Sequence, residues 1–186
     1  MALRPGRCFR RIERPYTRIS YSVKSKNYIP GAPPAKVRQY EMGNKNLQDY
    51  VELKLVAKED VQVRDNALEA ARVMCNKYLA KKVGEQNYFL KIIKYPHHVL
   101  REHPIAMGAG ADRYSQGMRL AFGRPVGRAV QLFKGEAIIL LRIKKEFLNF
   151  GKEALRIAAS KLPKGYKIVV SWKLLYLAIL TTIRKT

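Results

Sequence analysis

Residues 50–95 read YVELKLVAKEDVQVRDNALEAARVMCNKYLAKKVGEQNYFLKIIKY, and the periodicity of these residues indicates the fold class. Every second residue from Val51 to Leu55 is apolar, which is the period of a half-buried strand. After Asn66, the predicted N-cap, apolar residues recur at helical spacing until Gly84 stops the helix. Residues 88–95 predict a second strand, rich in aromatic and β-branched side chains. The result is a strand–helix–strand unit whose helix buries Ala67, Leu68, Ala71, Met74, Cys75, Tyr78 and Leu79.

The same order of elements recurs nearer the C-terminus. Residues 137–144 (AIILLRIK) and 167–172 (KIVVSW) predict strands, and residues 146–162 predict a helix between them. A further strand over residues 126–133 turns at residues 134–136 into the next one. Two such units predict an α+β fold, a two-layer sandwich with two helices packed on one face of a mostly antiparallel sheet. The second helix is expected to bury Phe147, Phe150, Ala154, Leu155 and Ala158.

The charge is large and unevenly distributed. The 186 residues include 37 Lys and Arg against 14 Asp and Glu, a formal net charge of +23. Residues 1–45 hold 11 basic and 2 acidic side chains, whereas residues 46–90 hold 7 of each. Because a free monomer would repel itself at this charge, the composition predicts a polyanionic partner that contacts the basic segments.

The first 45 residues contain five of the nine prolines and show no sustained helical or strand period. Basic and aromatic residues alternate there, a mixture suited to lying along a phosphate backbone while rings stack on bases. We interpret residues 1–45 as an extended basic arm that orders on RNA, the alternative being a disordered tail. Residues 46–172 are then a single α+β RNA-binding domain, and residues 173–186 a C-terminal tail. The predicted RNA-binding residues of the arm are Arg4, Arg7, Arg10, Arg11, Arg14, Tyr16, Arg18, Lys24 and Lys26.

Residues 96–127 form the second candidate site, a long Gly/Arg-rich loop between the two units. Long loops in compact domains are usually functional. Glycine lets the backbone approach a partner closely, and arginine offers a forked phosphate donor. The candidate residues are His97, His98, Arg101, His103, Arg113, Arg119, Arg124 and Arg128.

The sequence argues against catalysis, metals and membranes. The three histidines are poorly spaced for zinc, so RNA stacking or hydrogen bonding is the better interpretation of them. Residues 108–112 (GAGAD) lack the third spaced glycine of the dinucleotide-binding motif and the Gly-Lys-Ser/Thr of a P-loop. The N-terminal residues do not indicate a secretory signal, so we expect none, and the apolar run 174–180 is too short to span a bilayer. Cys8 and Cys75 suggest no disulfide, and Cys75 is expected to be a core residue. We expect no enzyme activity and no cofactor.

Six stretches together resemble one family, the archaeal and eukaryotic (ten-e type) form of the universal large-subunit ribosomal protein sixteen. The resemblance runs from residue 2 to about residue 167. The stretches are residues 2–5 (ALRP) with Arg7-Cys8, 14–18 (RPYTR), 66–72 (NALEAAR), 95–102 (YPHHVLRE), 108–113 (GAGADR), and 117–119 (GMR) followed by Phe122-Gly123.

The resemblance implies a cytoplasmic protein of the ribosome that packs among helices of the large-subunit ribosomal RNA. It also implies a position beside the corridor through which tRNA reaches the peptidyl transferase centre. In the family, the loop that matches residues 101–118 points towards tRNA in the A and P sites, and the basic arm threads through RNA. Neighbouring ribosomal proteins are further implied partners.

The C-terminal tail departs from the family, because residues 174–180 read LLYLAIL where relatives end in a polar or basic segment. Such a run can pack on its own sheet, contact a neighbouring protein, or enter a crevice between RNA helices. Two functions compete with the ribosomal one. The first is a non-ribosomal RNA-binding assembly factor, and the second is an enzyme that uses His97 or His98 as a general base.

Overall fold

Strand β2 (Tyr50–Ala57) forms where the alternating pattern predicts it and lies inside a five-stranded sheet. It pairs on one side with β7 (Ala137–Lys144) and on the other with β8 (Tyr166–Trp172). Strands β4 (Tyr88–Ile92) and β1 (Glu41–Gly43) complete the order β1-β4-β7-β2-β8. All of these pairs are antiparallel, as the sequence indicates. The computed structural model describes residues 4–12, 22–23, 25 and 29–172.

A second, three-stranded sheet has the order β3-β6-β5, with β3 at Val61–Arg64, β6 at Arg124–Leu132 and β5 at His98–Glu102. The expectation of one sheet is therefore wrong. Strands β6 and β7 follow each other through the predicted turn, yet they belong to different sheets. The amide of Gly135 in that turn donates to the carbonyl of Ala57, and the amide of Ala57 donates to the carbonyl of Glu136. These bonds redirect the chain from one sheet into the other.

Helix α1 (Asp65–Lys82) begins one residue before the predicted N-cap. Arg64 is the residue at the cap and makes no side-chain capping bond. Asp65 instead accepts the backbone N–H of Asn66 at 2.8 Å and the N–H of Lys36 at 3.1 Å, and both bonds lie near the start of the helix. At the other end Gly84 follows the C-cap residue Val83 and has a positive φ of +84°, which favours glycine, so the helix ends at the glycine that the sequence predicts.

The buried face of α1 consists of Asp65, Leu68, Ala71, Cys75 and Leu79. Ala67 and Tyr78 pack against the core from its margin. The prediction for Met74 is wrong, because its side chain is 40% exposed and lies beside the exposed Val73. The stripe of full burial is therefore narrower than the sequence pattern suggests.

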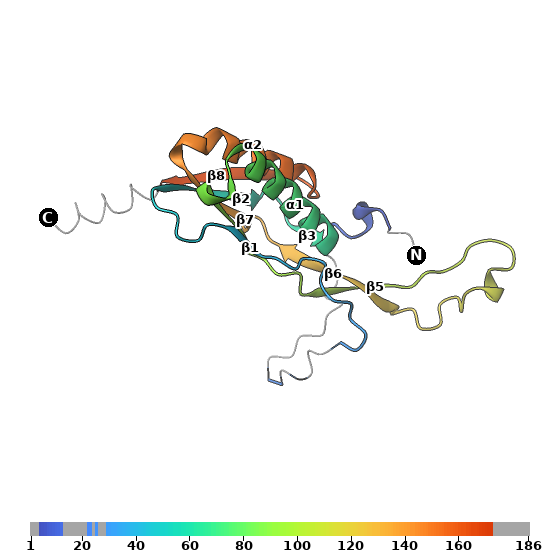
Figure 1. Ribbon diagram of the computed structural model, residues 1–186. Helices are drawn as coiled ribbons and strands as arrows, with labels where there is room; N and C mark the ends of the chain where they lie inside the picture. The colour runs from blue at the N-terminus through green and yellow to red at the C-terminus, as the bar shows by residue number, and fades with distance from the viewer. Residues whose placement is uncertain (1–3, 13–21, 24, 26–28, 173–186) are drawn as a thin grey trace.

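Helix α2 (Leu148–Ser160) lies beside α1, and both helices cover one face of the sheets (Figure 1). A Cβ on Gly151 would lie 2.8 Å from Cδ1 of Leu53 in β2, so the missing side chain allows α2 to pack closely on the sheet. The prediction that Phe150 is buried is wrong, since its side chain is 38% exposed. Phe147 packs against the core before the helix starts, in a short 3-10 turn at Lys145–Phe147. Ala154, Leu155 and Ala158 are buried as expected.

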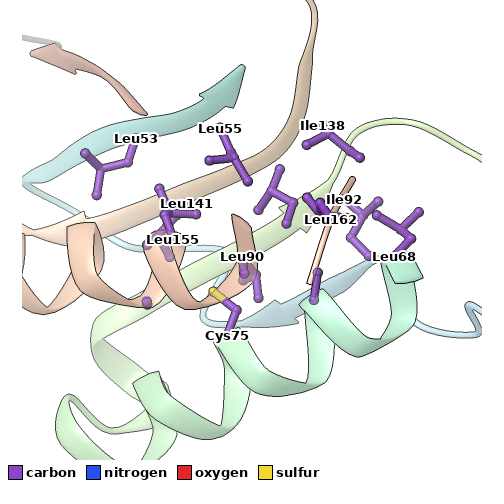
Figure 2. Packing of buried hydrophobic residues seen from close by; sticks show 14 of the residues in the cluster. Leu53, Leu55, Leu68, Cys75, Leu90, Ile92, Ile138, Leu141, Leu155 and Leu162 are labelled. Carbon is purple, nitrogen blue, oxygen red and sulfur yellow. The ribbon is translucent and has the colours of Figure 1, made fainter. Parts of the chain in front are cut away.

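The two helices and both sheets share a single hydrophobic core. Figure 2 shows Leu53, Leu141 and Leu90 of the five-stranded sheet facing Leu155 of α2 and Cys75 of α1. Burial raises the pKa of the Cys75 thiol to about 12, so this thiol stays protonated and unreactive near neutral pH. The interpretation of Cys75 as a core residue is confirmed.

Strands β5 and β6 form a hairpin that reaches away from the two-layer body (Figure 1). The sequence suggests irregular structure over residues 96–127, whereas residues 98–102 and 124–127 are paired in this hairpin. The irregular part within it is limited to residues 103–123, which include a short 3-10 turn at Ala111–Arg113. We call residues 98–132 the β5–β6 hairpin. Strand β5 pairs with β6, which comes more than 20 residues later in the chain, so no local sequence pattern reveals this pairing.

Candidate nucleic-acid interface

The first candidate surface is the N-terminal segment of residues 4–12, which lies along the outer edge of β3. The backbone N–H of Gln62 donates to the carbonyl of Arg10 at 2.9 Å, and the side-chain amide of Gln62 donates to the carbonyl of Phe9 at 2.9 Å. The guanidinium of Arg64 donates to the carbonyl of Arg4 at 2.8 Å. Three bonds to backbone carbonyls therefore fix the path of this segment against the domain.

This attachment leaves the basic side chains outside. Arg4, Arg7, Arg10 and Arg11 are all exposed. Among the described residues, Arg4 is the one of the four with an acidic partner, Glu102, at 3.9 Å, and that distance makes a weak surface ion pair. The segment is anchored through its backbone, and its guanidinium groups point outward. They can therefore contact a phosphate backbone instead of being paired within the domain.

The remaining predicted arm residues lie outside the described residues. They are Arg14, Tyr16, Arg18, Lys24 and Lys26. Phe9, one of the ring residues of the arm, is half-buried, and the Arg64 guanidinium lies 5.5 Å from the centre of its ring.

The second candidate surface is the outer part of the β5–β6 hairpin. At its base, Nη1 of Arg101 donates to the carbonyl of Gly123 at 3.1 Å, and the guanidinium lies 4.2 Å from the centre of the Phe122 ring. Gly123 adopts φ +75°, and a Cβ there would lie 2.5 Å from the carbonyl oxygen of Glu102. Nε2 of His103 is 2.6 Å from the carbonyl of Gly117. These contacts hold the two sides of the loop together.

Beyond this base, the loop exposes large apolar side chains. Met107 is 97% exposed and Tyr114 is 87% exposed. Met118, Leu120 and Phe122 are exposed as well, and the side chains of Arg113, Arg119 and Arg124 accompany them. Arg113, Tyr114 and Arg119 line a groove of about 880 Å³. Exposed rings beside exposed guanidinium groups match the chemistry of nucleic-acid contact by stacking and charge.

Three of the eight predicted loop residues do not face outward: Arg101, which holds the base of the loop, His98 and Arg128. His98 is only 3% exposed, and burial together with the neighbouring His97 lowers its pKa, so it stays neutral near pH 7. Arg128 donates through Nε to the carbonyl of Pro33 at 2.7 Å and through Nη1 to the Tyr95 hydroxyl at 3.4 Å. Arg128 thus ties the end of the arm segment to β6. By contrast, His97 is exposed, and within the described part of the chain its ring is bonded to the Tyr95 carbonyl alone.

The sequence interpretation missed two residues of the interface, Gln62 and Arg64, which hold the arm. The alternation in residues 61–64 (VQVR) was the available signal, because it places both polar side chains on one face of a short strand.

Within residues 4–12, 22–23, 25 and 29–172, no group of three or more His, Cys, Asp or Glu side chains is arranged to hold a metal ion. In the part of the chain that the structure describes, no helix combines the length and the apolar content that a membrane crossing requires.

Comparison with known proteins agrees with these observations. The family model described as ribosomal protein L16p/L10e matches residues 16–169. The large ribosomal subunit protein uL16 of Archaeoglobus fulgidus is 55% identical over 170 residues, covering 91% of this chain and 94% of the relative. The proteins of the same description from Sulfolobus acidocaldarius and Nanoarchaeum equitans are 51% and 52% identical over 174 and 172 residues. These alignments cover 92% and 89% of this chain and 95% and 91% of the two relatives. The fold, the basic segments and these matches together show that the chain belongs to the ribosomal protein L16p/L10e family.

Proposed function

We propose that this protein is a structural constituent of the large ribosomal subunit that binds large-subunit ribosomal RNA and shapes the tRNA corridor near the peptidyl transferase centre. Membership of a ribosomal protein family supports a structural role without catalysis, in the ribosome of the cytoplasm. The relatives carry the description of large ribosomal subunit proteins, and they align over nearly their whole length. RNA and neighbouring ribosomal proteins are the partners that this role requires.

Binding of ribosomal RNA is assigned to the arm. Its described part is fixed to β3 through backbone carbonyls, which leaves Arg7, Arg10 and Arg11 exposed and without acidic partners within the described residues. Phosphate contacts of this kind fix the position of a protein on RNA without reading its sequence. The predicted binding residues Arg14, Tyr16, Arg18, Lys24 and Lys26 extend the same basic segment along the chain.

Contact with tRNA is assigned to the outer part of the β5–β6 hairpin, and one observation carries this proposal. The loop is held at its base by Arg101 and Gly123 while its outer part exposes rings and guanidinium groups. A surface that is held in place and not buried by its own domain is suited to shaping a site in a larger assembly. Arg113, Arg119 and Arg124 are the residues expected to face tRNA, together with His97 and His103.

The test begins with sedimentation of a cell extract at high salt, followed by detection of the chain in each fraction. Stable residence in mature large subunits and whole ribosomes is expected. Residence only in light or precursor fractions would overturn the ribosomal role in favour of the assembly-factor alternative.

The tRNA assignment has its own test, in large subunits that carry the double variant Arg113→Ala and Arg119→Ala. Binding of tRNA in the A site should weaken several-fold, because two exposed cations are lost. The matched control removes Lys152 and Lys161, which lie in and just after α2. Equal A-site binding by both variants would remove the tRNA assignment and leave the RNA-binding role intact.

A further inference from the structure

An amide-rich groove of about 640 Å³ lies at the end of the five-stranded sheet where β2 and β4 begin and β7 ends. The N-terminal segment and the β5–β6 hairpin lie at the other end of the body (Figure 1). The groove is therefore separate from the two surfaces described above. Its walls are the loop of residues 44–49, the 3-10 turn at Glu85–Asn87 and the end of β7. Five of the lining residues are amides: Asn44, Asn46, Gln48, Gln86 and Asn87.

The 44–49 loop is tied to the chain around the start of β4, so the groove exists before any ligand arrives. The backbone N–H of Asn44 donates to the carbonyl of Tyr88 at 2.9 Å, and its side-chain amide donates to the carbonyl of Gln86 at 3.3 Å. Leu47 anchors the middle of the loop, because its side chain is only 7% exposed. These contacts hold two walls of the groove in fixed positions relative to each other.

Three of the amides have side chains that make no hydrogen bond to another described residue. They are Asn46, Gln48 and Gln86, and all three are exposed. Asn87, by contrast, donates to the carbonyl of Val83 at 2.9 Å and is used within the protein. A carboxamide carries both donors and acceptors of hydrogen bonds. The three exposed side chains therefore match a ligand whose own groups both donate and accept.

The charged residues of the groove balance one another. Lys144 and Lys145 line it together with Asp49 and Glu146, and all four side chains are exposed. Because the lining has no excess of positive charge, it is not suited to holding a phosphate group in its centre. The two lysines are adjacent at the end of β7, and their long side chains can reach a phosphate beside the groove.

The lining also differs from two other common kinds of binding site. Small-molecule pockets are lined mainly by apolar and aromatic side chains, and protein interfaces concentrate aromatic residues and Met at their centres. Among the described residues of this lining, Leu47 is the one apolar side chain, and it is buried. The chemistry of the groove instead fits a surface rich in hydroxyl groups.

We propose that this groove binds the minor groove of double-stranded RNA. Asn46, Gln48 and Gln86 bond to ribose 2′-hydroxyls, and Lys144 and Lys145 contact the flanking phosphates. The minor groove of A-form RNA is wide and shallow and displays a row of 2′-hydroxyls, each of which both donates and accepts a hydrogen bond. The inference rests on the proposed RNA-binding function and deepens it by naming a surface that distinguishes RNA from DNA.

The test measures affinities of the full-length protein for two fluorescein-labelled duplexes of one sequence and about 16 base pairs, at 200 mM salt. One duplex is RNA and the other is 2′-O-methyl RNA, which keeps the charge and the A-form helix but has no 2′-hydroxyl donor. The RNA duplex should bind at least fivefold more tightly. Equal affinities would overturn the proposal, and they would leave the ribosomal role intact if the chain sediments with large subunits.

A double variant locates the preference in the groove. Gln48→Ala with Gln86→Ala should reduce the preference for the RNA duplex at least threefold, because two hydroxyl contacts are lost. The matched control, Gln39→Ala with Ser160→Ala, removes two exposed polar side chains that do not line the groove, and it should keep the full preference. A full preference in the groove variant would show that the preference arises elsewhere, which would contradict the proposed site.

A second double variant separates phosphate contacts from hydroxyl contacts. Lys144→Ala with Lys145→Ala should weaken binding of both duplexes by the same factor, at least threefold, because both carry the same phosphates. The preference for the RNA duplex should not change. The matched control is Lys77→Ala with Lys81→Ala, two exposed lysines of α1 outside the groove. Equal losses in the two lysine variants would contradict the placement of a duplex beside Lys144 and Lys145.

Discussion

Arg101 and Gly123 join the two sides of the β5–β6 hairpin, because Nη1 of Arg101 donates to the carbonyl oxygen of Gly123 at 3.1 Å. Gly123 is held at φ +75° directly against the backbone of Glu102. The orientation of the exposed loop relative to the body therefore depends on a contact that tolerates no side chain at residue 123.

Gly123→Ala should open the base of the hairpin. The new Cβ would lie 2.5 Å from the carbonyl oxygen of Glu102, so the two backbones must separate. Amide hydrogen exchange in residues 99–102 and 124–127 should accelerate at least tenfold. Gly110→Ala is the matched control, because Gly110 also has a left-handed φ of +79° but open space around it. Gly110→Ala should reduce the free energy of unfolding only by the roughly 1–2 kcal/mol that the left-handed conformation costs an alanine. Equal exchange in the two variants would show that the contact at Glu102 does not hold the hairpin.

Removing Arg7, Arg10 and Arg11 together should weaken the salt dependence of RNA binding. Each phosphate contact contributes about 0.7 to 0.9 to the slope of log affinity against log salt, so the slope should fall by roughly two to three. The matched control replaces Lys77, Lys81 and Lys82, three exposed lysines of α1, with alanine. Affinity titrations from 50 to 300 mM salt measure both slopes. An unchanged slope in the arm variant means that these arginines do not contact phosphate.

Leu68→Asp should unfold the domain. Leu68 is fully buried in the core between α1 and the sheets, and an unpaired carboxylate there costs about 3 kcal/mol or more. Val73→Asp, on the exposed side of the same helix, should change stability by less than about 0.5 kcal/mol. Thermal unfolding followed by circular dichroism compares the two. Equal midpoints would contradict the orientation of α1.

The carboxylate of Glu41 should make folding sensitive to acid. Hydrogen bonds from Lys45 and Lys91 lower its pKa from 4.5 to about 2. Because the unfolded chain binds this proton more readily, the stabilisation is present above about pH 4.5 and is lost as the pH falls towards 2. Glu41→Gln should therefore flatten the acid limb of the stability curve in urea unfolding at pH 6, 4 and 3. Glu85→Gln, which removes an exposed carboxylate without an ion pair in the described part of the chain, should keep the wild-type slope.

Strand β7 has the bounds that its sequence predicts, residues 137–144, because a continuous apolar run buried between two strands needs no distant information. The buried stripes of both helices follow largely from helical spacing. Met74 and Phe150 are exceptions, because the burial of a side chain at the edge of a helix face depends on the neighbouring element and not on the helix itself.

The candidate site is less predictable than the fold. Charge and glycine content locate the basic arm and the β5–β6 hairpin, and they select arginines such as Arg113 that are exposed. They do not distinguish Arg128, whose guanidinium is committed to Pro33 and Tyr95. Charge and glycine content also do not predict Gln62, a neutral residue whose role comes only from the position of the arm beside β3.

The docked N-terminal segment has a consequence for the protein before it meets RNA. β3 is an edge strand, and its outer amide at Gln62 is occupied by the carbonyl of Arg10. Exposed edges of sheets invite pairing between chains and lead to aggregation. We therefore expect the arm to protect the newly made protein from self-association, so a chain that lacks residues 1–12 should precipitate sooner than the full-length chain at the same concentration.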